Sequence, residues 1–198
     1  MDEPDIKTRF VIQLGRTFGM TSTSNMDIVQ TVPIPDMDRY VYDQFRVTEM
    51  MSPYLLGFLV SDFVNTTTVD PTFQIMHAPG KEDQAKLAAD AGPQILYYLE
   101  HYFGVEYSLP KMDMVAIPDF NGAVENWGLV TYRESIIMHS EGISSQRDRD
   151  LVIEEVSHEL AHMWFGNLVT MEWWTDLWLN DGKILYIFFR KYFSNNYN

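Results

Sequence analysis

Short runs of alternating apolar and polar residues occupy the chain from residue 6 to residue 64. Residues 9–14 and 43–47 are typical of these runs, and turns rich in Gly, Pro, Asn and Ser separate them. Such alternation between turn residues predicts β-strands. The apolar run at residues 54–60 is too short to span a membrane and also predicts a strand.

From residue 82 onward the spacing of the apolar residues changes. Between residues 82 and 103 the apolar side chains have helical spacing, which predicts an amphipathic helix. Its apolar side consists of Leu87, Ala91, Ile95, Tyr98 and Leu99. Pro93 predicts a kink or a new start within this helix. Strands return between residues 111 and 133, and a polar loop and a second helix follow.

The second helix carries the candidate chemistry. Asp150 is its expected N-cap, and Glu154 and Glu155 fall in the early turns, where the helix dipole favours negative charge. Its apolar residues at helical spacing are Leu151, Val152, Val156, Leu160 and Met163. The pattern predicts a capped helix with a buried side.

Two histidines on this helix have the spacing of a metal site. His158 and His162 are four residues apart, so both imidazoles lie on one face of the helix and can reach a single ion. Glu159 lies about 100° around the helix from His158, close enough to contact a water on that ion. Zinc lowers the pKa of such a water, and a carboxylate can take its proton. The pattern indicates a metallohydrolase with Glu159 as general base; the alternative is a structural pair of histidines.

A third metal ligand is expected from another helix packed beside the first, and Asp181 is the candidate. Residues 164–180, which precede it, are aromatic and apolar enough to form a buried wall. The alternative is that residues 180–182 are only a turn, because Asp-Gly is a strong turn signal. Asp176 is either an outer partner of a zinc-bound histidine or a cap of the second helix.

Residues 158–182 resemble the signature of the gluzincin zinc aminopeptidases, the aminopeptidase N and glutamyl aminopeptidase group. That family has a glutamate ligand in a Trp-Leu-Asn-Glu-Gly setting, where this chain has Asp181 in Trp-Leu-Asn-Asp-Gly. Aspartate is shorter by one methylene, or about 1.3 Å, and zinc–oxygen bonds are about 2.0–2.2 Å long. We therefore expect the helix to shift or a water to fill the gap.

A second motif at residues 122–128 resembles the family's Gly-Ala-Met-Glu-Asn-Trp-Gly strand, with Val124 in place of methionine. The resemblance implies that Glu125 anchors the α-ammonium group of a peptide by a charge-assisted hydrogen bond. It implies substrate-binding roles also for Gly122, Ala123 and Asn126. The strand's backbone can pair with an extended peptide. Residues 119–122 are one residue shorter than the family's usual lead, which predicts a shift of Glu125 relative to the metal.

The resemblance implies an α+β fold, seen here as a fragment. Residues 1–77 are expected to be the C-terminal part of an all-β N-terminal domain, and residues 78–182 the first part of a thermolysin-like zinc-metallopeptidase catalytic domain. Residues 183–198 are interpreted as a divergent tail of non-native sequence.

The function that the resemblance implies is zinc-dependent removal of N-terminal residues from peptides, with one Zn²⁺ per chain. The family's oxyanion-stabilising tyrosine would lie beyond residue 198. The alternative reading is therefore a truncated, catalytically inactive relative that binds zinc or peptide weakly.

The composition and net charge argue against some classes of binding partner and of chemistry. The 198 residues are 46% hydrophobic and 14% aromatic, as expected of a protein with a sizeable core. A formal net charge of −14 argues against binding to nucleic acid or an anionic membrane. The chain has no cysteine, which excludes thiol catalysis. It has neither a membrane-length apolar segment nor a signal pattern, and family members are plasma-membrane ectoenzymes or cytoplasmic. Compartment and oligomeric state have no signature in the sequence.

Overall fold

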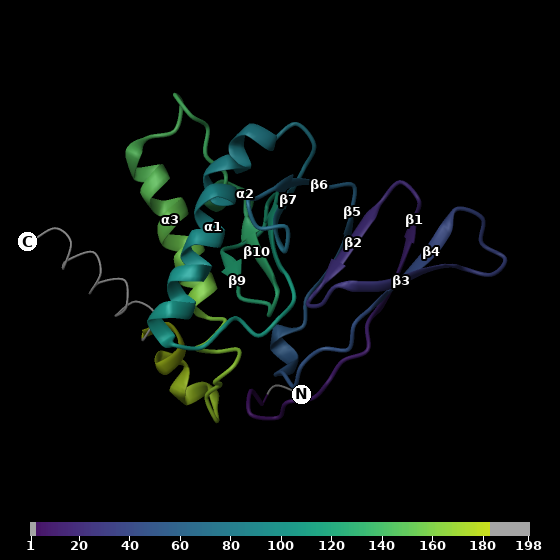
Figure 1. Ribbon diagram of the computed structural model, residues 1–198, viewed down its shortest axis with the longest axis horizontal. Helices are drawn as coiled ribbons and strands as arrows, with labels where there is room; N and C mark the ends of the chain where they lie inside the picture. Colours follow the sequence, from purple (N-terminus) through teal and green to yellow (C-terminus); the bar gives the residue numbers. More distant parts are fainter. Residues whose placement is uncertain (1–2, 183–198) are drawn as a thin grey trace, which may run out of the picture.

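A mixed five-stranded sheet lies at the centre of the computed structural model, which describes residues 3–182 (Figure 1). Its strands, in order across the sheet, are β6 (Val64–Thr67), β7 (Phe73–His77), β8 (Met112–Ile117), β10 (Leu129–Arg133) and β9 (Ala123–Val124). β7, β8 and β10 are parallel, whereas β6 and β9 are antiparallel edge strands. Parallel neighbours need a crossover connection, and helix α1 provides it between β7 and β8.

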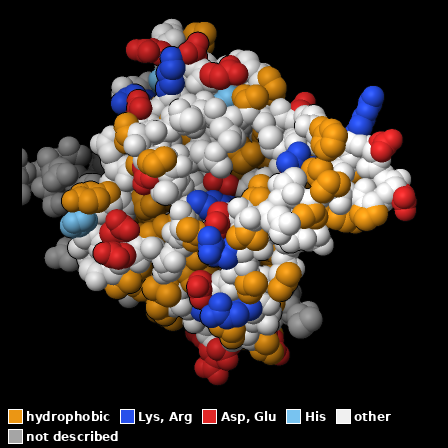
Figure 2. All heavy atoms as spheres, turned by 45° about the vertical axis from the view of Figure 1, so that its right-hand side comes forward, with side chains coloured by type: hydrophobic (Ala, Val, Ile, Leu, Met, Phe, Trp, Pro, Cys, Tyr) orange, Lys and Arg blue, Asp and Glu red, His pale blue; other side chains and the backbone are white. Residues whose placement is uncertain are grey.

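Two smaller antiparallel sheets come from the N-terminal part of the chain. One contains β1 (Gln13–Thr17), β4 (Tyr40–Phe45) and β3 (Ile28–Pro33), and the other contains β2 (Thr21–Ser24) and β5 (Phe58–Ser61). They lie to the right of the five-stranded sheet in Figure 1, away from the helices. Several large apolar side chains on them are exposed, and Figure 2 shows such side chains between charged ones on this side of the molecule.

The predicted strands of this region are confirmed in kind, with shifted boundaries. The prediction of one strand over residues 54–60 is wrong in its first half, because Pro53–Leu55 forms a short 3-10 helix, η1, and β5 starts only at Phe58. Pro53 is the first helical residue of η1, a position where the fixed φ of proline favours a helical turn.

Helix α1 (Glu82–Phe103) has the bounds that its periodicity predicts. Glu82 and Asp83 lie in the first turn, where the helix dipole favours acidic residues. Gly104 ends the helix in the left-handed conformation, with φ at 67°. The helix continues through Pro93, so the predicted new start at this residue is wrong.

The buried side of α1 differs from the predicted one. It consists mostly of small residues: Ala85, Ala88, Ala89, Gly92, Leu96 and Leu99. A Cβ on Gly92 would lie 2.5 Å from Cζ of Phe73 in β7, so the helix lies closer to the sheet than a larger residue would allow. Of the predicted apolar side only Leu99 is fully buried, whereas Tyr98 is 38% exposed.

Helix α3 (Gln146–Ala161) packs beside α1 (Figure 1). Ser145 is its N-cap: the Ser145 hydroxyl accepts from the Asp148 backbone N–H, and the Asp148 carboxylate accepts from the Ser145 backbone N–H. This capping box corrects the prediction of Asp150 as the cap. Asp150 lies inside the helix and accepts a hydrogen bond from the Gln146 side chain.

Short elements flank α3. α2 (Glu134–Ile137) follows β10 directly, and a polar loop leads from it to the start of α3, as predicted. After α3 the chain forms a series of turns and the 3-10 helix η2 (Trp174–Asp176), and residues 177–182 are helical.

Strand β8 is buried on both sides of the sheet, which explains its nearly unbroken run of buried residues. Met112, Met114 and Ala116 belong to the main hydrophobic core, together with the buried side chains of α1 and α3. Val115 belongs to a second apolar cluster, against which Leu59 of β5 packs. The central sheet thus separates the helices from the smaller sheets.

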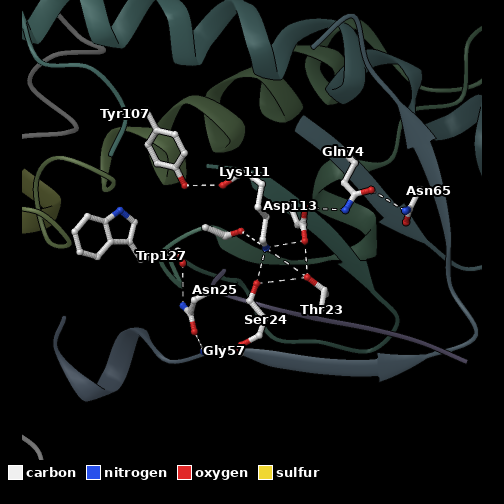
Figure 3. Close-up of polar contacts among 11 residues, drawn as sticks. Thr23, Ser24, Asn25, Gly57, Asn65, Gln74, Tyr107, Lys111, Asp113 and Trp127 are labelled. Carbon is white, nitrogen blue, oxygen red and sulfur yellow. Dashed lines mark hydrogen bonds and ion pairs between the residues drawn. The ribbon is translucent and has the colours of Figure 1, made fainter. Parts of the chain in front are cut away.

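Lys111 and Asp113 form a buried ion pair where the start of β8 meets β2 (Figure 3). Lys111 Nζ lies 2.7 Å from Asp113 Oδ2. The same Nζ donates to the backbone oxygens of Ser24 and Gly128, and the Thr23 hydroxyl donates to Asp113. Burial lowers the pKa of Lys111, and the Asp113 carboxylate opposes this shift. The ion pair fastens the smaller sheets to the central one.

The fold is α+β with several sheets, which confirms the predicted class. β6 and β7 belong to the same sheet as β8, so this sheet extends across the boundary predicted between residues 77 and 78. Residues 183–198, interpreted above as a divergent tail, lie outside the described residues. No helix within residues 3–182 has the length and apolar character needed to cross a membrane.

We expect Lys111→Met to lower the free energy of unfolding by about 3–5 kcal/mol, because it leaves the Asp113 carboxylate buried without its cation. Urea unfolding followed by tryptophan fluorescence measures this change. The control is Lys111→Met combined with Asp113→Asn, which should be more stable than the single variant because no unpaired charge remains. A single variant as stable as the original chain would contradict the structural role given to the ion pair.

Candidate metal centre

The two candidate histidines lie at the C-terminal end of α3. His158 is in the last turn, and His162 is the C-cap residue, still with helical backbone angles (φ −59°, ψ −22°). Their Nε2 atoms are 3.1 Å apart, and the ring planes make an angle of 79°. The two nitrogen atoms therefore converge on one point, as the four-residue spacing predicts.

The other ring nitrogen of His162 fixes its tautomer. Nδ1 lies 2.8 Å from Oδ1 of Asn180 and 3.0 Å from the backbone oxygen of Phe165. Both partners are acceptors, so Nδ1 carries the proton and Nε2 presents its lone pair. Metal-binding histidines usually have such an outer partner.

Asn180, and not Asp176, is the outer partner of His162. Within residues 3–182 the Asp176 carboxylate makes no hydrogen bond to either histidine. Asn180 reaches the ring because residues 177–182 pack closely on Gly166, which has φ at 120°. A Cβ on Gly166 would lie 2.6 Å from the Asn180 Oδ1 atom, so only glycine leaves room for this contact.

Asp181 completes a set of three ligand atoms. Its Oδ1 atom is 3.7 Å from Nε2 of His158 and 3.7 Å from Nε2 of His162. In a triangle with sides of 3.1, 3.7 and 3.7 Å, the point equidistant from the corners lies about 2.0 Å from each. This distance matches zinc–nitrogen and zinc–oxygen bonds of about 2.0–2.2 Å. The donor set therefore fits zinc. The adjacent His158 imidazole lowers the pKa of Asp181.

Glu159 lies beside the three donor atoms. Its side chain is buried, and its Oε2 atom has no hydrogen-bond partner within residues 3–182. Burial raises the pKa of Glu159 to about 9, with further contributions from Glu125, Glu155 and Asp181. A cation held by the histidines would favour the ionised carboxylate again.

The Glu125 carboxylate belongs to the same cluster, despite the shortened lead into its segment. One oxygen of Glu125, one oxygen of Glu159 and one ring nitrogen of His162 all lie within 4.8 Å of one another. The structure therefore brings together the two motifs that are separated in the sequence. It places the candidate amine-binding group beside the candidate metal ligands.

The other residues of the upstream motif have different surroundings. Gly122 adopts φ at 75° before β9, and Ala123 pairs with Tyr132 of β10. Within residues 3–182, β10 is the only strand paired with β9, so β9 is an edge strand whose other edge pairs with no described strand. The Asn126 side chain is buried and accepts from the Thr131 hydroxyl at 3.4 Å, so it supports the segment from inside.

Tyr54 of η1 also lies near the centre, although no sequence pattern singles it out. Its hydroxyl donates to the backbone oxygen of Gly166 at 3.2 Å, and its ring packs edge-to-face on Trp174. Burial raises the pKa of Tyr54, with smaller contributions from Glu125 and Asp181. Because Tyr54 comes from the N-terminal part of the chain, only the tertiary structure reveals its place. The sequence offered one indication of the role of Asn180, because this residue directly precedes the candidate ligand Asp181.

Comparison with known proteins places the chain among peptidases. Residues 87–197 match the Peptidase family M1 domain. Endoplasmic reticulum aminopeptidase 1 of Rattus norvegicus is 44% identical over 185 residues, which are 91% of this chain and 20% of that protein. Puromycin-sensitive aminopeptidase of Caenorhabditis elegans is 40% identical over 185 residues, which are 91% of this chain and 19% of that protein. Aminopeptidase M1-A of Oryza sativa subsp. japonica is 45% identical over 185 residues, with 91% and 21% covered.

The chain spans about a fifth of the length of the curated relatives it matches. The matched domain covers more than half of the chain and includes the histidine motif, Glu125 and Asp181. Its relatives bear the names of aminopeptidases, which confirms the resemblance predicted from the two motifs. The chain belongs to peptidase family M1, the gluzincin aminopeptidases, as a fragment.

Proposed function

We propose that this chain forms the metal-binding and amine-binding part of a zinc aminopeptidase, which removes N-terminal residues from peptides. His158, His162 and Asp181 would hold one zinc ion per chain. Glu159 is the general base, and Glu125 binds the free amino group of the substrate. The observation that carries this proposal is the convergence of three donor atoms at distances that suit zinc, with two further carboxylates beside them.

The ligand residues are supported by the fold. The Nδ1 proton of His162 is held by Asn180 and Phe165, so its Nε2 lone pair is directed at the centre. Zinc, when bound there, supplies a positive charge that lowers the pKa of a water in its open position. Two neutral imidazoles and one carboxylate leave such a position open.

Glu159 is the group that moves the proton. Its unpaired Oε2 atom is free to accept a proton from the attacking water and later to donate it to the leaving amine. Its burial among acidic neighbours raises its proton affinity, which suits a group that must hold a proton between these two steps.

Glu125 limits cleavage to the first residue. A carboxylate close to the metal ligands binds the α-ammonium group of a peptide, and a residue without a free amino group would leave this carboxylate unpaired. The open edge of β9 supports an extended peptide by backbone pairing. The proposed partners are thus peptides with a free N-terminus.

The domain assignment is part of the same proposal. Residues 78–182 would be the first part of a thermolysin-like catalytic domain, and residues 1–77 the C-terminal part of an all-β domain. What supports it is the concentration of the site on α3, on residues 177–182 and on the segment after β9, all within residues 78–182, although β6 and β7 join the central sheet from the other side of this boundary.

The experiment that tests the metal site is a zinc titration by calorimetry. We expect one zinc ion per chain, and we expect Asp181→Ala to weaken binding by more than the roughly 10- to 100-fold typical of an outer-shell substitution. Asp176→Ala is the matched control, because its carboxylate is five residues away and contacts neither histidine, and it should bind zinc normally. Equal zinc affinity in Asp181→Ala and the original chain would exclude Asp181 as a ligand.

Asn180→Ala should weaken zinc binding by roughly 10- to 100-fold, because His162 loses the acceptor that fixes its tautomer. The same calorimetric titration measures this effect. Asn65→Ala is the control, since Asn65 lies exposed on β6 and bonds only to the Gln74 side chain among the described residues. The outer-partner role is wrong if Asn180→Ala and Asn65→Ala bind zinc equally well.

Glu159→Gln should keep one zinc ion per chain and reduce release of an N-terminal leucine from a short peptide by at least about 100-fold, because glutamine cannot accept the water's proton. Mass spectrometry of the peptide after long incubation with the zinc-loaded chain measures the release. The general-base assignment fails if the original chain releases leucine and Glu159→Gln releases it as fast at equal zinc content, whereas no release by the original chain would favour the inactive relative.

A further inference from the structure

The backbone that carries Glu125 is held at three carbonyl groups by side chains from other parts of the chain. The Asn167 side chain donates to the Glu125 oxygen at 2.9 Å. Two residues on, the Asn25 side chain donates to the Trp127 oxygen at 2.9 Å, as Figure 3 shows. Lys111 donates to the next oxygen, that of Gly128, at 2.8 Å. Glu125 is therefore at the end of a segment whose backbone position is fixed by side chains.

Asn167 differs from the other two donors because it also contacts a candidate metal ligand. Its backbone N–H donates to the His162 oxygen at 3.1 Å, while its side-chain Nδ2 donates to the Glu125 oxygen at 2.9 Å. Two hydrogen bonds through one residue thus join the backbone of the amine-binding residue to the backbone of the histidine. No other described residue bridges His162 and Glu125 through hydrogen bonds in this way.

Asn167 is itself fixed in place. It is completely buried, and it lies in the tight turn that follows α3. The turn is closed by a hydrogen bond from the Gly166 N–H to the Val169 oxygen at 2.7 Å. From outside the turn, Lys7 Nζ donates to the Asn167 oxygen at 3.1 Å. A buried side chain in such a turn has little freedom to move, so it transmits the position of His162 to Glu125.

The amide of Asn167 has no acid–base or nucleophilic chemistry of its own at neutral pH. Its Nδ2 contacts the backbone of Glu125 and not the carboxylate, so it acts on the substrate only through Glu125. Recognition of an amino terminus needs a fixed spacing between the carboxylate and the metal, and an error of 1 Å can reduce such a function by about 100-fold.

We propose that Asn167 is a positioning residue, which sets the spacing between the Glu125 carboxylate and the metal ligand His162 and thereby the preference for ligands with a free amino group. This inference rests on the proposed roles of Glu125 and the metal centre. It adds that the specificity of the site depends on a residue in the turn after α3, which touches neither the metal nor the substrate.

The test compares two probes on the zinc-loaded chain by calorimetry. Leucine hydroxamate carries a metal-binding group and a free amine, whereas N-acetyl-leucine hydroxamate carries the same group with the amine blocked. The ratio of the two Kd values measures amine recognition apart from metal binding. We expect a preference for the free amine of about 10-fold or more in the original chain, as for a hydrogen bond to a charged group.

Asn167→Ala should reduce this preference at least about fivefold, while the zinc content and the Kd of the acetylated probe stay unchanged. A general loss of structure would instead weaken both probes together. Asn167→Leu is the second variant, because leucine fills a similar volume without an N–H donor and so keeps the experiment informative if the alanine variant does not fold.

Thr170→Val is the matched control. Its hydroxyl donates to the Gly166 oxygen at 2.7 Å and lies 3.3 Å from the Asn167 backbone oxygen, but no hydrogen bond joins it to the Asn167 side chain or to Glu125. Removing this hydroxyl should lower the melting temperature and leave the preference for the free amine intact. If Thr170→Val reduces the preference as much as Asn167→Ala does, then loosening of the turn and not the Asn167 contact explains the effect, and the proposal is wrong.

Glu125→Gln distinguishes amine recognition by Glu125 from the positioning role of Asn167. If it removes the preference while folded Asn167 variants keep it, Asn167 has no positioning role and the proposed function of Glu125 stands. If Glu125→Gln leaves the preference unchanged, amine recognition by Glu125 is wrong, and the role of Asn167 is overturned with it.

Discussion

The hydrogen bond between Nδ1 of His162 and Oδ1 of Asn180 is the contact on which the metal centre depends. It orients the imidazole, and it also fixes residues 177–182 against the end of α3, which places Asp181 next to both histidines. The contact exists because Gly166 has no side chain in the space that the Asn180 amide occupies. A single close approach between a turn and a helix thus fixes the His162 tautomer and places the candidate third ligand, Asp181.

The carboxylates around Glu159 form a cluster of negative charge that a bound cation would stabilise. Glu125, Glu155 and Asp181 all raise the proton affinity of Glu159, and burial adds the largest contribution. Carboxylates at this density repel one another unless a positive charge lies among them. Another buried carboxylate, that of Asp113, is instead neutralised by a side chain of the protein, Lys111. The fold therefore contains a buried carboxylate paired with a lysine and, separately, a cluster of carboxylates around the candidate metal ligands, where the proposed zinc ion would supply the positive charge.

The sequence predicted those parts whose signal is local. The histidine spacing needs only one helix, and the bounds of α1 follow from acidic residues at its start and Gly104 at its end. Alternation located the β segments, but not the 3-10 turn that starts at Pro53. The predicted apolar side of α1 is correct for Leu99 and in part for Leu87 and Ile95, but it omits the small residues that face the sheet, where Gly92 lets the helix lie close to Phe73. Asn167 and Tyr54 had no signal, since each acquires its role from segments far away in sequence.

The hydrogen bond from Lys7 to the oxygen of Asn167 joins residues 160 positions apart. The N-terminal strands are synthesised before the turn after α3, so this contact forms only once residue 167 has been made. Contacts of such separation slow folding, because a long loop must close before they stabilise anything. Buried apolar side chains of the N-terminal part, such as Met51 and Leu55 of the main hydrophobic core, lack part of their packing partners over that interval, and exposed apolar surface of this kind favours aggregation. The hydrogen bond that holds the turn beside Glu125 therefore also couples the first residues of the sequence to a late step of folding.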